Sequence, residues 1–278
     1  MKQADLKALI TLLDDHDPEI YSHIESKILE LGTGLIPLLE KEWESNLNHL
    51  VQQRIESLIH QLQYARLQER LVDWIENKQD DLLFGMWVIA TYLYPDLELD
   101  TLKEQIENLF YEVWKQIKND TDEFEKIGIL NDVLYTQYHF SSNTKNFHSP
   151  NNSMINMVLE QKKGNPISLA VVYLLVSQRL RIPVFGVNLP KLFVLTYRSS
   201  EEIFYLNTNN RGQIFHHEDI SKFIEELKIP PKNEYYEPCS HLDIIVRVLR
   251  NLEQSYTKLN DKDRVKDIRL LLTLALEG

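Results

Sequence analysis

Cysteine is nearly absent from this chain of 278 residues, which contains only Cys239. A single cysteine excludes an internal disulfide framework and a zinc site built on several thiolates. Cys239 follows Pro238 in the C-terminal linker, away from the segment in which we look for an activated thiol. We therefore expect Cys239 to be a small packing residue and not a nucleophile.

Glycine is scarce as well, with eight residues in the chain. None of them belongs to a glycine-rich loop of the kind that cradles nucleotide phosphates. The segment His216-His217-Glu218-Asp219 suggests a metal site, but adjacent histidines on a strand point to opposite faces and no third ligand with zinc spacing follows. We expect a helix start at this segment, and neither a metal nor a cofactor.

Positive charge is in deficit, with 30 Lys and Arg against 42 Asp and Glu. The excess falls on residues 1–118, which hold 22 acidic against 11 basic residues. An acidic chain without a basic stripe repels phosphate backbones, so we do not expect a nucleic acid partner. The acidic helices are best explained as solvated surface, with a docking face for a basic partner as the alternative.

Long apolar runs are missing too, since no run approaches the roughly 20 residues that a membrane-spanning helix needs. The charged residues Lys2, Asp5 and Lys7 interrupt any apolar start, which disfavours a signal peptide. We expect a cytoplasmic protein that does not insert in a membrane.

Helical periodicity dominates residues 1–118, as at Ile20, Ile24 and Ile28, where apolar residues recur every four positions. Asp17-Pro18 supplies an N-cap followed by proline at the first helical position. The segment 12–32 resembles one HEAT-type helical repeat. Beyond residue 35, the expected helices are 35–43, 47–63, 65–77, 80–93 and 101–118.

After residue 119, the expected elements include strands as well as helices. The expected helices are 123–138, 167–180 and 218–227, and the expected strands are 184–188, 192–197, 203–206 and 213–215. Pro230-Pro231 marks a boundary, and the helices 242–259 and 261–276 form a hairpin similar to one TPR unit, which must dock on the rest.

We predict an α+β fold that is mostly α, with a small antiparallel sheet and helical regions on both sides. The expected domains are a HEAT-like part at 1–118, an α+β core at 119–229 and a TPR-like hairpin at 238–278. The helix 167–180 should pack on the sheet along a seam formed by Val171, Leu174, Leu175, Phe185, Val187 and Phe193.

Residues 147–198 carry a series of short motifs. These are Asn152-Ser153 with Val158-Leu159, Gly164-Asn165-Pro166-Ile167-Ser168-Leu169, Arg181-Ile182-Pro183, and Gly186-Val187-Asn188-Leu189-Pro190 with Phe193. The series resembles the pattern N-S-x-L-x-x-V-L, G-x-P-I-x-L, G-[IV]-P and G-V-N-x-P-x-x-F of the SirB-type transglutaminase-like family of bacterial proteins. The resemblance covers about residues 120–225, and the segment 206–212 matches its I-D-P-F-x-G-G.

This resemblance implies a site in which a Cys at a helix N-terminus, a His on a strand and an Asp or Asn on the next strand cooperate. The corresponding positions in this chain are Pro166, Leu192 and Asn207. Proline has no nucleophilic side chain, and leucine cannot accept a proton. The resemblance thus implies the scaffold of an acyl-transfer enzyme without its catalytic residues.

Other residues could in principle replace the missing ones. Ser168 lies in the first turn of the expected helix, and His139 and His148 flank the loop before it. Serine in a first turn commonly bonds to backbone, and histidines are common in surface loops. A hydrolase or acyltransferase that uses Ser168 with His139 or His148 is the alternative.

Our main functional hypothesis is a non-catalytic transglutaminase-like protein that binds a protein or peptide partner. We expect Pro166, Leu192 and Asn207 to converge in one pocket with an apolar floor. The predicted binding groove consists of Asn152, Asn165, Pro166, Pro190, Leu192 and Asn207. A regulator that binds a small ligand in this groove is a third possibility.

Overall fold

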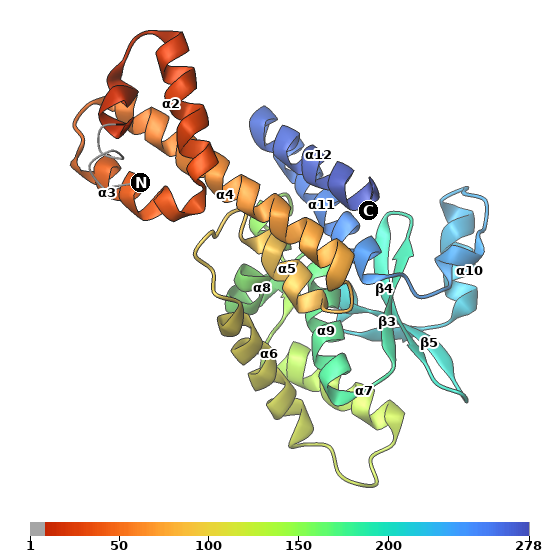
Figure 1. The fold of residues 1–278 in the computed structure, drawn as a ribbon. Coiled ribbons are helices and arrows are strands. Elements are labelled where there is room, and N and C mark those ends of the chain that lie inside the picture. Colours follow the sequence, from red (N-terminus) through yellow and green to blue (C-terminus); the bar gives the residue numbers. More distant parts are fainter. Residues whose placement is uncertain (1–8, 278) are drawn as a thin grey trace. The chain divides into compact units, whose positions relative to one another are not determined.

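The computed structural model describes residues 9–277. By their contacts these residues fall into two compact units, Met1–Arg70 and Leu71–Gly278 (Figure 1). The division lies within helix α4 (His49–Asn77) and so precedes the domain boundary that we expected at residue 118. The reason is that α5 (Leu82–Ala90) and α6 (Leu99–Trp114) pack on the helices of the core and belong to its unit.

The elements of the first unit, as far as the structure describes it from residue 9 on, are helices and 3-10 turns. It contains the 3-10 turns η1 (Leu12–Asp14) and η2 (Thr33–Leu35), the helices α2 (Pro18–Leu31) and α3 (Ile36–Ser45), and the first part of α4. The N-cap expected at Asp17 is confirmed, because its carboxylate accepts a hydrogen bond of 2.9 Å from the backbone N–H of Glu19. The sequence also predicts an apolar helical stripe at Leu6, Leu9, Ile10 and Leu13, of which Leu6 lies outside the described residues.

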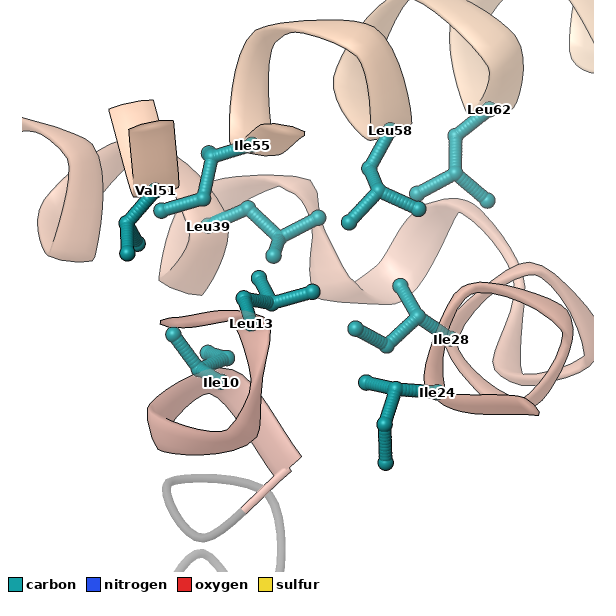
Figure 2. Packing of buried hydrophobic residues seen from close by; sticks show 9 residues of the cluster. All are labelled: Ile10, Leu13, Ile24, Ile28, Leu39, Val51, Ile55, Leu58 and Leu62. Carbon is teal, nitrogen blue, oxygen red and sulfur yellow. The ribbon is translucent and has the colours of Figure 1, made fainter. Parts of the chain in front are cut away.

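Apolar side chains from these helices meet in one buried cluster, which Figure 2 shows. Its members are Ile10, Leu13, Ile24, Ile28, Leu39, Val51, Ile55, Leu58 and Leu62. Three- and four-residue spacings place them on the inner face of each helix. The helix break that we expected near Tyr64 is wrong, since α4 continues through this position. Neither Gly nor Pro stands there to interrupt it.

The second unit contains the sheet and the helices around it. Its further helical elements are α7 (Glu123–Asn131), the π-helical turn η3 (Asp132–Gln137), η4 (Pro150–Ser153), α8 (Ile155–Gln161), α9 (Pro166–Leu180), η5 (Thr208–Asn210), α10 (His217–Glu226), η6 (Asn233–Tyr235), α11 (His241–Lys258) and α12 (Lys262–Glu277). Its strands are β1 (Ser141–Ser142), β2 (Lys163–Gly164), β3 (Val184–Leu189), β4 (Leu192–Arg198), β5 (Ile203–Asn207) and β6 (Gln213–Phe215).

The main sheet is antiparallel, with the strand order β3-β4-β5-β6. Neighbouring strands follow one another along the chain, so short turns suffice to connect them. The fold is therefore α+β and mostly α, as predicted. A separate parallel pair, β1 with β2, joins Ser141 to Lys163 and Ser142 to Gly164, in a region where we expected only a loop.

The two faces of the main sheet are covered by different helices (Figure 1). One face packs on α10 through a cluster that contains Val187, Leu189, Val194, Ile220 and Ile224. The opposite face packs on α9 and α11. Because side chains alternate along a strand, each residue of β3 and β4 serves one helix layer or the other.

Five of the six residues predicted for the seam between helix and sheet are buried, and Phe185 is not. Of these five, Val187 packs in the cluster with α10, so its assignment to the seam with α9 is wrong. The side chain of Phe185 is 43% exposed. Phe185 lies on the same face as Val187 and Leu189, but the cluster with α10 includes only those two residues of β3. The ring of Phe185, near the start of β3, is therefore partly exposed to solvent.

The C-terminal hairpin of α11 and α12 packs on other helices of the second unit. The two helices pack on each other, and α11 also contacts α5, α9 and η4. Ser240 begins α11 with a capping box, in which its hydroxyl accepts from the N–H of Asp243 and its own N–H donates to the carboxylate of that residue.

Candidate functional site

The N-terminus of α9 is the point where the missing nucleophile would stand. Asn165 caps the helix, and its Oδ1 accepts a hydrogen bond of 2.9 Å from the N–H of Ser168. The hydroxyl of Ser168 in turn accepts from the N–H of Asn165 at 3.0 Å. Pro166 occupies the first helical position, where its missing N–H costs nothing. Local sequence alone thus explains why the helix begins here.

This cap uses the hydroxyl of Ser168 in hydrogen bonds to the backbone. Ser168 is fully buried, and within the described chain its Oγ is hydrogen-bonded only to the backbone of Asn165. A Cβ added at Gly164 would lie 2.3 Å from that Oγ, which shows how closely the hydroxyl is enclosed. Among residues 9–277, no histidine is hydrogen-bonded to Ser168, although the alternative with His139 or His148 requires such a bond.

Asn152 is a buried support of the neighbouring loop. Its Nδ2 donates to the carbonyl oxygens of Asn146 and Phe147, at 2.7 and 3.0 Å, and its Oδ1 accepts from Asn143 at 2.8 Å. Its backbone carbonyl accepts from the N–H of Asn165 at 3.3 Å. Asn152 therefore links the loop at 143–149 to the start of α9, and its side-chain amide is used in these hydrogen bonds.

A hollow of about 320 Å³ opens beside the start of α9, and we call it the α9 hollow. The loop contributes Phe147 and His148, the turn between β3 and β4 contributes Lys191, and α11 supplies one wall. Its lining comprises Phe147, His148, Asn165, Pro166, Ile167, Lys191, Phe193, Arg247, Asn251, Gln254 and Ser255.

Leu192 and Asn207 lie elsewhere, in a second hollow of about 350 Å³ beside α10. The expected convergence of Pro166, Leu192 and Asn207 in one pocket is therefore wrong. Leu192 pairs with Leu189, and both residues face α10, whereas Phe193 lies on the opposite face, toward α9. Alternation along β4 separates positions that are adjacent in sequence.

The loop after β5 still approaches α9. The hydroxyl of Thr208 donates to the carbonyl oxygen of Pro166 at 3.3 Å. The side chain of Asn207 is used locally, because its Oδ1 accepts from the N–H of Asn209 at 3.1 Å. Pro190 lines neither of these two hollows. Of the six predicted groove residues, only Asn165 and Pro166 line the α9 hollow.

The two candidate histidines differ in position. His139 is exposed and has a positive φ of 60°, and it lines neither hollow. His148 is also exposed and lines the α9 hollow, where its ring meets that of Phe147 edge to face at 5.2 Å between centroids. No hydroxyl or thiol of the described residues is hydrogen-bonded to His148. Its ring forms part of the wall of the hollow.

Cys239 packs as the sequence suggested. Its N–H donates to the carbonyl of Gly186 at 2.8 Å, and a Cβ added at Gly186 would lie 3.2 Å from its sulfur. Burial, reinforced by the charge of Asp243, raises the pKa of the Cys239 thiol to about 12. The thiol stays protonated at neutral pH.

His216 and His217 start α10, as the sequence predicts. The N–H of His216 donates to the carboxylate of Asp219 at 2.9 Å, and the ring of His217 stacks on Tyr236 with 4.1 Å between centroids. Within residues 9–277, no group of three or more His, Cys, Asp or Glu side chains is placed to hold a metal ion. None of the helices described has the length and apolar character needed to cross a bilayer.

The contribution of α11 to the α9 hollow was not predicted from the sequence. Arg247, Asn251 and Gln254 lie on one face of this helix, at spacings of four and three residues. That polar stripe is visible in the sequence, but nothing local indicates that it faces the start of α9. Only the docking of the hairpin brings the two segments together.

Comparison with known proteins adds family information. The sequence model of the Transglutaminase-like superfamily matches residues 100–250, more than half of the chain. The chain is 28% identical over 200 residues to a UPF0162 protein of Xylella fastidiosa, a match that covers 68% of this chain and 70% of the relative. A UPF0162 protein of Vibrio cholerae is 25% identical over 151 residues, covering 54% of this chain and 56% of the relative.

One similarity extends to a eukaryotic protein. F-box only protein 21 of Mus musculus is 34% identical over 76 residues, which is 27% of this chain and 12% of that protein. No solved structure matches the chain. The matched residues 100–250 include α9, the whole main sheet and most of the α9 hollow. On this match, the chain belongs to the Transglutaminase-like superfamily.

Proposed function

We propose that this chain is a non-catalytic transglutaminase-like protein that binds a protein or peptide partner in the α9 hollow. One observation carries the proposal. At the start of α9, where a nucleophile would be needed, Pro166 has no reactive group. The side-chain oxygens of Asn165 and Ser168 are hydrogen-bonded within the helix cap. The start of α9 therefore offers no group that could attack an acyl substrate, whereas the hollow beside it can still bind a ligand.

The alternative, a hydrolase or acyltransferase with relocated residues, requires Ser168 to be reachable. Its full burial and its two bonds to Asn165 argue against this role. We therefore expect no hydrolysis, deamidation or cross-linking of peptide substrates by the purified chain. The proposal would be overturned by an activity that Ser168→Ala abolishes while the variant remains folded.

Binding itself is tested by selecting peptides from a displayed random library with the purified full chain. The blocking variant Gln254→Trp places a large ring in the lining of the hollow at an exposed position of α11. The control Lys258→Trp adds the same ring one turn later, outside the lining. We expect peptides that bind the wild type and Lys258→Trp but not Gln254→Trp.

The proposal also covers the cellular location of the protein and the role of its helical flanks. We place the protein in the cytoplasm, where a single unpaired cysteine is compatible with a reducing environment. The helical flanks, similar to HEAT and TPR units in sequence, would extend the surface available to a macromolecular partner. A selection that returns only small molecules from a mixed library, and no peptide, would favour a regulator that binds a small ligand.

A further inference from the structure

The charge of the α9 hollow is opposite to that of the chain. The chain carries a formal net charge of −12. Yet the described residues that line the hollow include Lys191, Arg247 and His148, and none of them is Asp or Glu. A concave surface lined by one sign of charge concentrates ligands of the other sign.

Arg247 is held in place by the protein, with part of its guanidinium left over. Its Nη1 donates to Oδ1 of Asn188 at 3.1 Å and to the carbonyl of Leu189 at 3.4 Å. Within the described chain it has no ion pair with a carboxylate. Burial and the nearby Arg250 lower the pKa of Arg247 from its ordinary value, although a guanidinium remains charged. Its remaining N–H donors are oriented before a ligand arrives.

The backbone of Lys191 has a defined conformation. Lys191 lies in the tight turn between β3 and β4 with a positive φ of 63°, a conformation that residues other than Gly and Asn adopt at a cost. Its side chain is exposed and, as far as the described chain extends, has no acidic partner. The turn thus presents a second unpaired cation to the same hollow.

The rest of the lining suits a peptide. Asn251 and Gln254 make no side-chain hydrogen bond to any described residue, so their amides can bind a peptide backbone. Phe147, whose side chain is 60% exposed, forms with the ring of His148 an apolar wall for a neighbouring side chain.

The volume of about 320 Å³ lies at the lower end of the range for ligand pockets. The hollow offers a polyanion such as nucleic acid only two unpaired cations, Lys191 and Arg247. The acidic remainder of the chain would repel it.

We infer that the α9 hollow recognises an acidic peptide segment, in which carboxylates contact Lys191 and Arg247 and an adjacent apolar residue packs on Phe147. This inference rests on the proposed function and adds the chemistry of the partner. Arginine suits a carboxylate because its planar donors can bind both oxygens. Lysine contributes a point charge at the rim.

The test uses the full chain and three displayed peptide libraries that differ at two central positions. One library has Asp or Glu there, the second has Asn or Gln, and the third has phosphoserine. We expect enrichment of the acidic library. The fluorescently labelled acidic peptides should also bind at least tenfold more weakly when the ionic strength rises from about 0.05 M to about 0.5 M, because the screening length shortens several-fold.

Matched variants locate the charge. Lys191→Asn removes one cation and suits a positive φ, and Lys228→Asn makes the same change at another exposed lysine with a positive φ of 54° that lies outside the lining. Arg247→Gln is paired with Arg250→Gln on the same helix. We expect about tenfold weaker binding for each hollow variant, as is typical of a lost charge-assisted hydrogen bond, and less than a twofold change for each control.

The outcomes separate this inference from the proposed function. Selected peptides that Gln254→Trp blocks, but that are neutral or only phosphorylated, would keep the proposed function and overturn the acidic partner. Equal effects of Lys191→Asn and Lys228→Asn would overturn it as well. If no selected peptide distinguishes the wild type from Gln254→Trp, both the proposed function and the acidic partner are overturned. Should Arg247→Gln fail to fold, as judged by circular dichroism, the lysine pair decides.

Discussion

Among single residues, Gly164 illustrates how closely the start of α9 is packed. A Cβ at this position would lie 2.3 Å from Oγ of Ser168 and 3.2 Å from both methyl carbons of Val158. We expect Gly164→Ala to lower the free energy of unfolding by about 1–3 kcal/mol, because the cap must be displaced to make room. Urea unfolding followed by circular dichroism measures the change.

The control for this substitution is Gly128→Ala in α7, where an added Cβ would meet nothing within 4 Å. Alanine is favoured over glycine in a helix, so this variant should gain about 0.5–1 kcal/mol. If the two substitutions change stability in the same direction and by the same amount, the close contact between Gly164 and Ser168 is not present in solution.

Cys239 is the second residue with a clear chemical expectation. Since burial raises its pKa to about 12, little thiolate exists at pH 8. We expect iodoacetamide to alkylate the folded chain at least about a hundredfold more slowly than the urea-unfolded chain, whose thiol has an ordinary pKa near 8.5. Cys239→Ser should leave peptide binding unchanged. Rapid alkylation of the folded chain at pH 8 would contradict the burial of this thiol.

The same shift predicts how stability depends on pH. The folded chain holds the thiol proton more tightly than the unfolded chain does. The contribution of Cys239 is therefore fully present below the unfolded pKa and is lost as pH rises from that value toward about 12. Cys239→Ser should lose less stability than the wild type over this alkaline range, when both are followed by thermal unfolding.

Helix α9 is the central element of the second unit, since its apolar side chains are buried on nearly all sides. Leu174 is 2% exposed, so Leu174→Ala should cost about 2–5 kcal/mol of unfolding free energy through the cavity that it leaves. Leu270→Ala, at a side chain 46% exposed on α12, should cost less than about 1 kcal/mol. A comparable loss in both variants would place α9 outside the core.

For the molecule as a whole, the contacts indicate two separate cores. The cluster around Ile28 draws its buried members from residues 10–62, all within the first unit. We expect Ile28→Ala to accelerate amide exchange in α2 and α3 while α9 keeps its protection, because opening is local to a cooperative unit. Leu174→Ala should produce the reverse pattern. Equal loss of protection in α9 from both variants would show one cooperative core.

Much of the fold follows from local signals. The N-caps at Asp17 and Asn165 and the proline after each define helix starts, and the apolar runs of β3 and β4 define strands. The errors occur where a local signal is ambiguous. Tyr64 was placed in a helix break without Gly or Pro, and Phe185 was assigned to a seam from hydrophobicity alone, although its face of β3 is only partly covered.

The sequence by itself determined the order of elements, the antiparallel sheet and the absence of a nucleophile at Pro166, because these depend on neighbours within a few residues. Only the tertiary structure decided the site. Strand alternation directs Leu192 toward α10 and Phe193 toward α9, while the docking of α11 brings Arg247 to a helix start about 80 residues earlier. Such contacts depend on which faces pack together, and no local pattern in the chain records that choice.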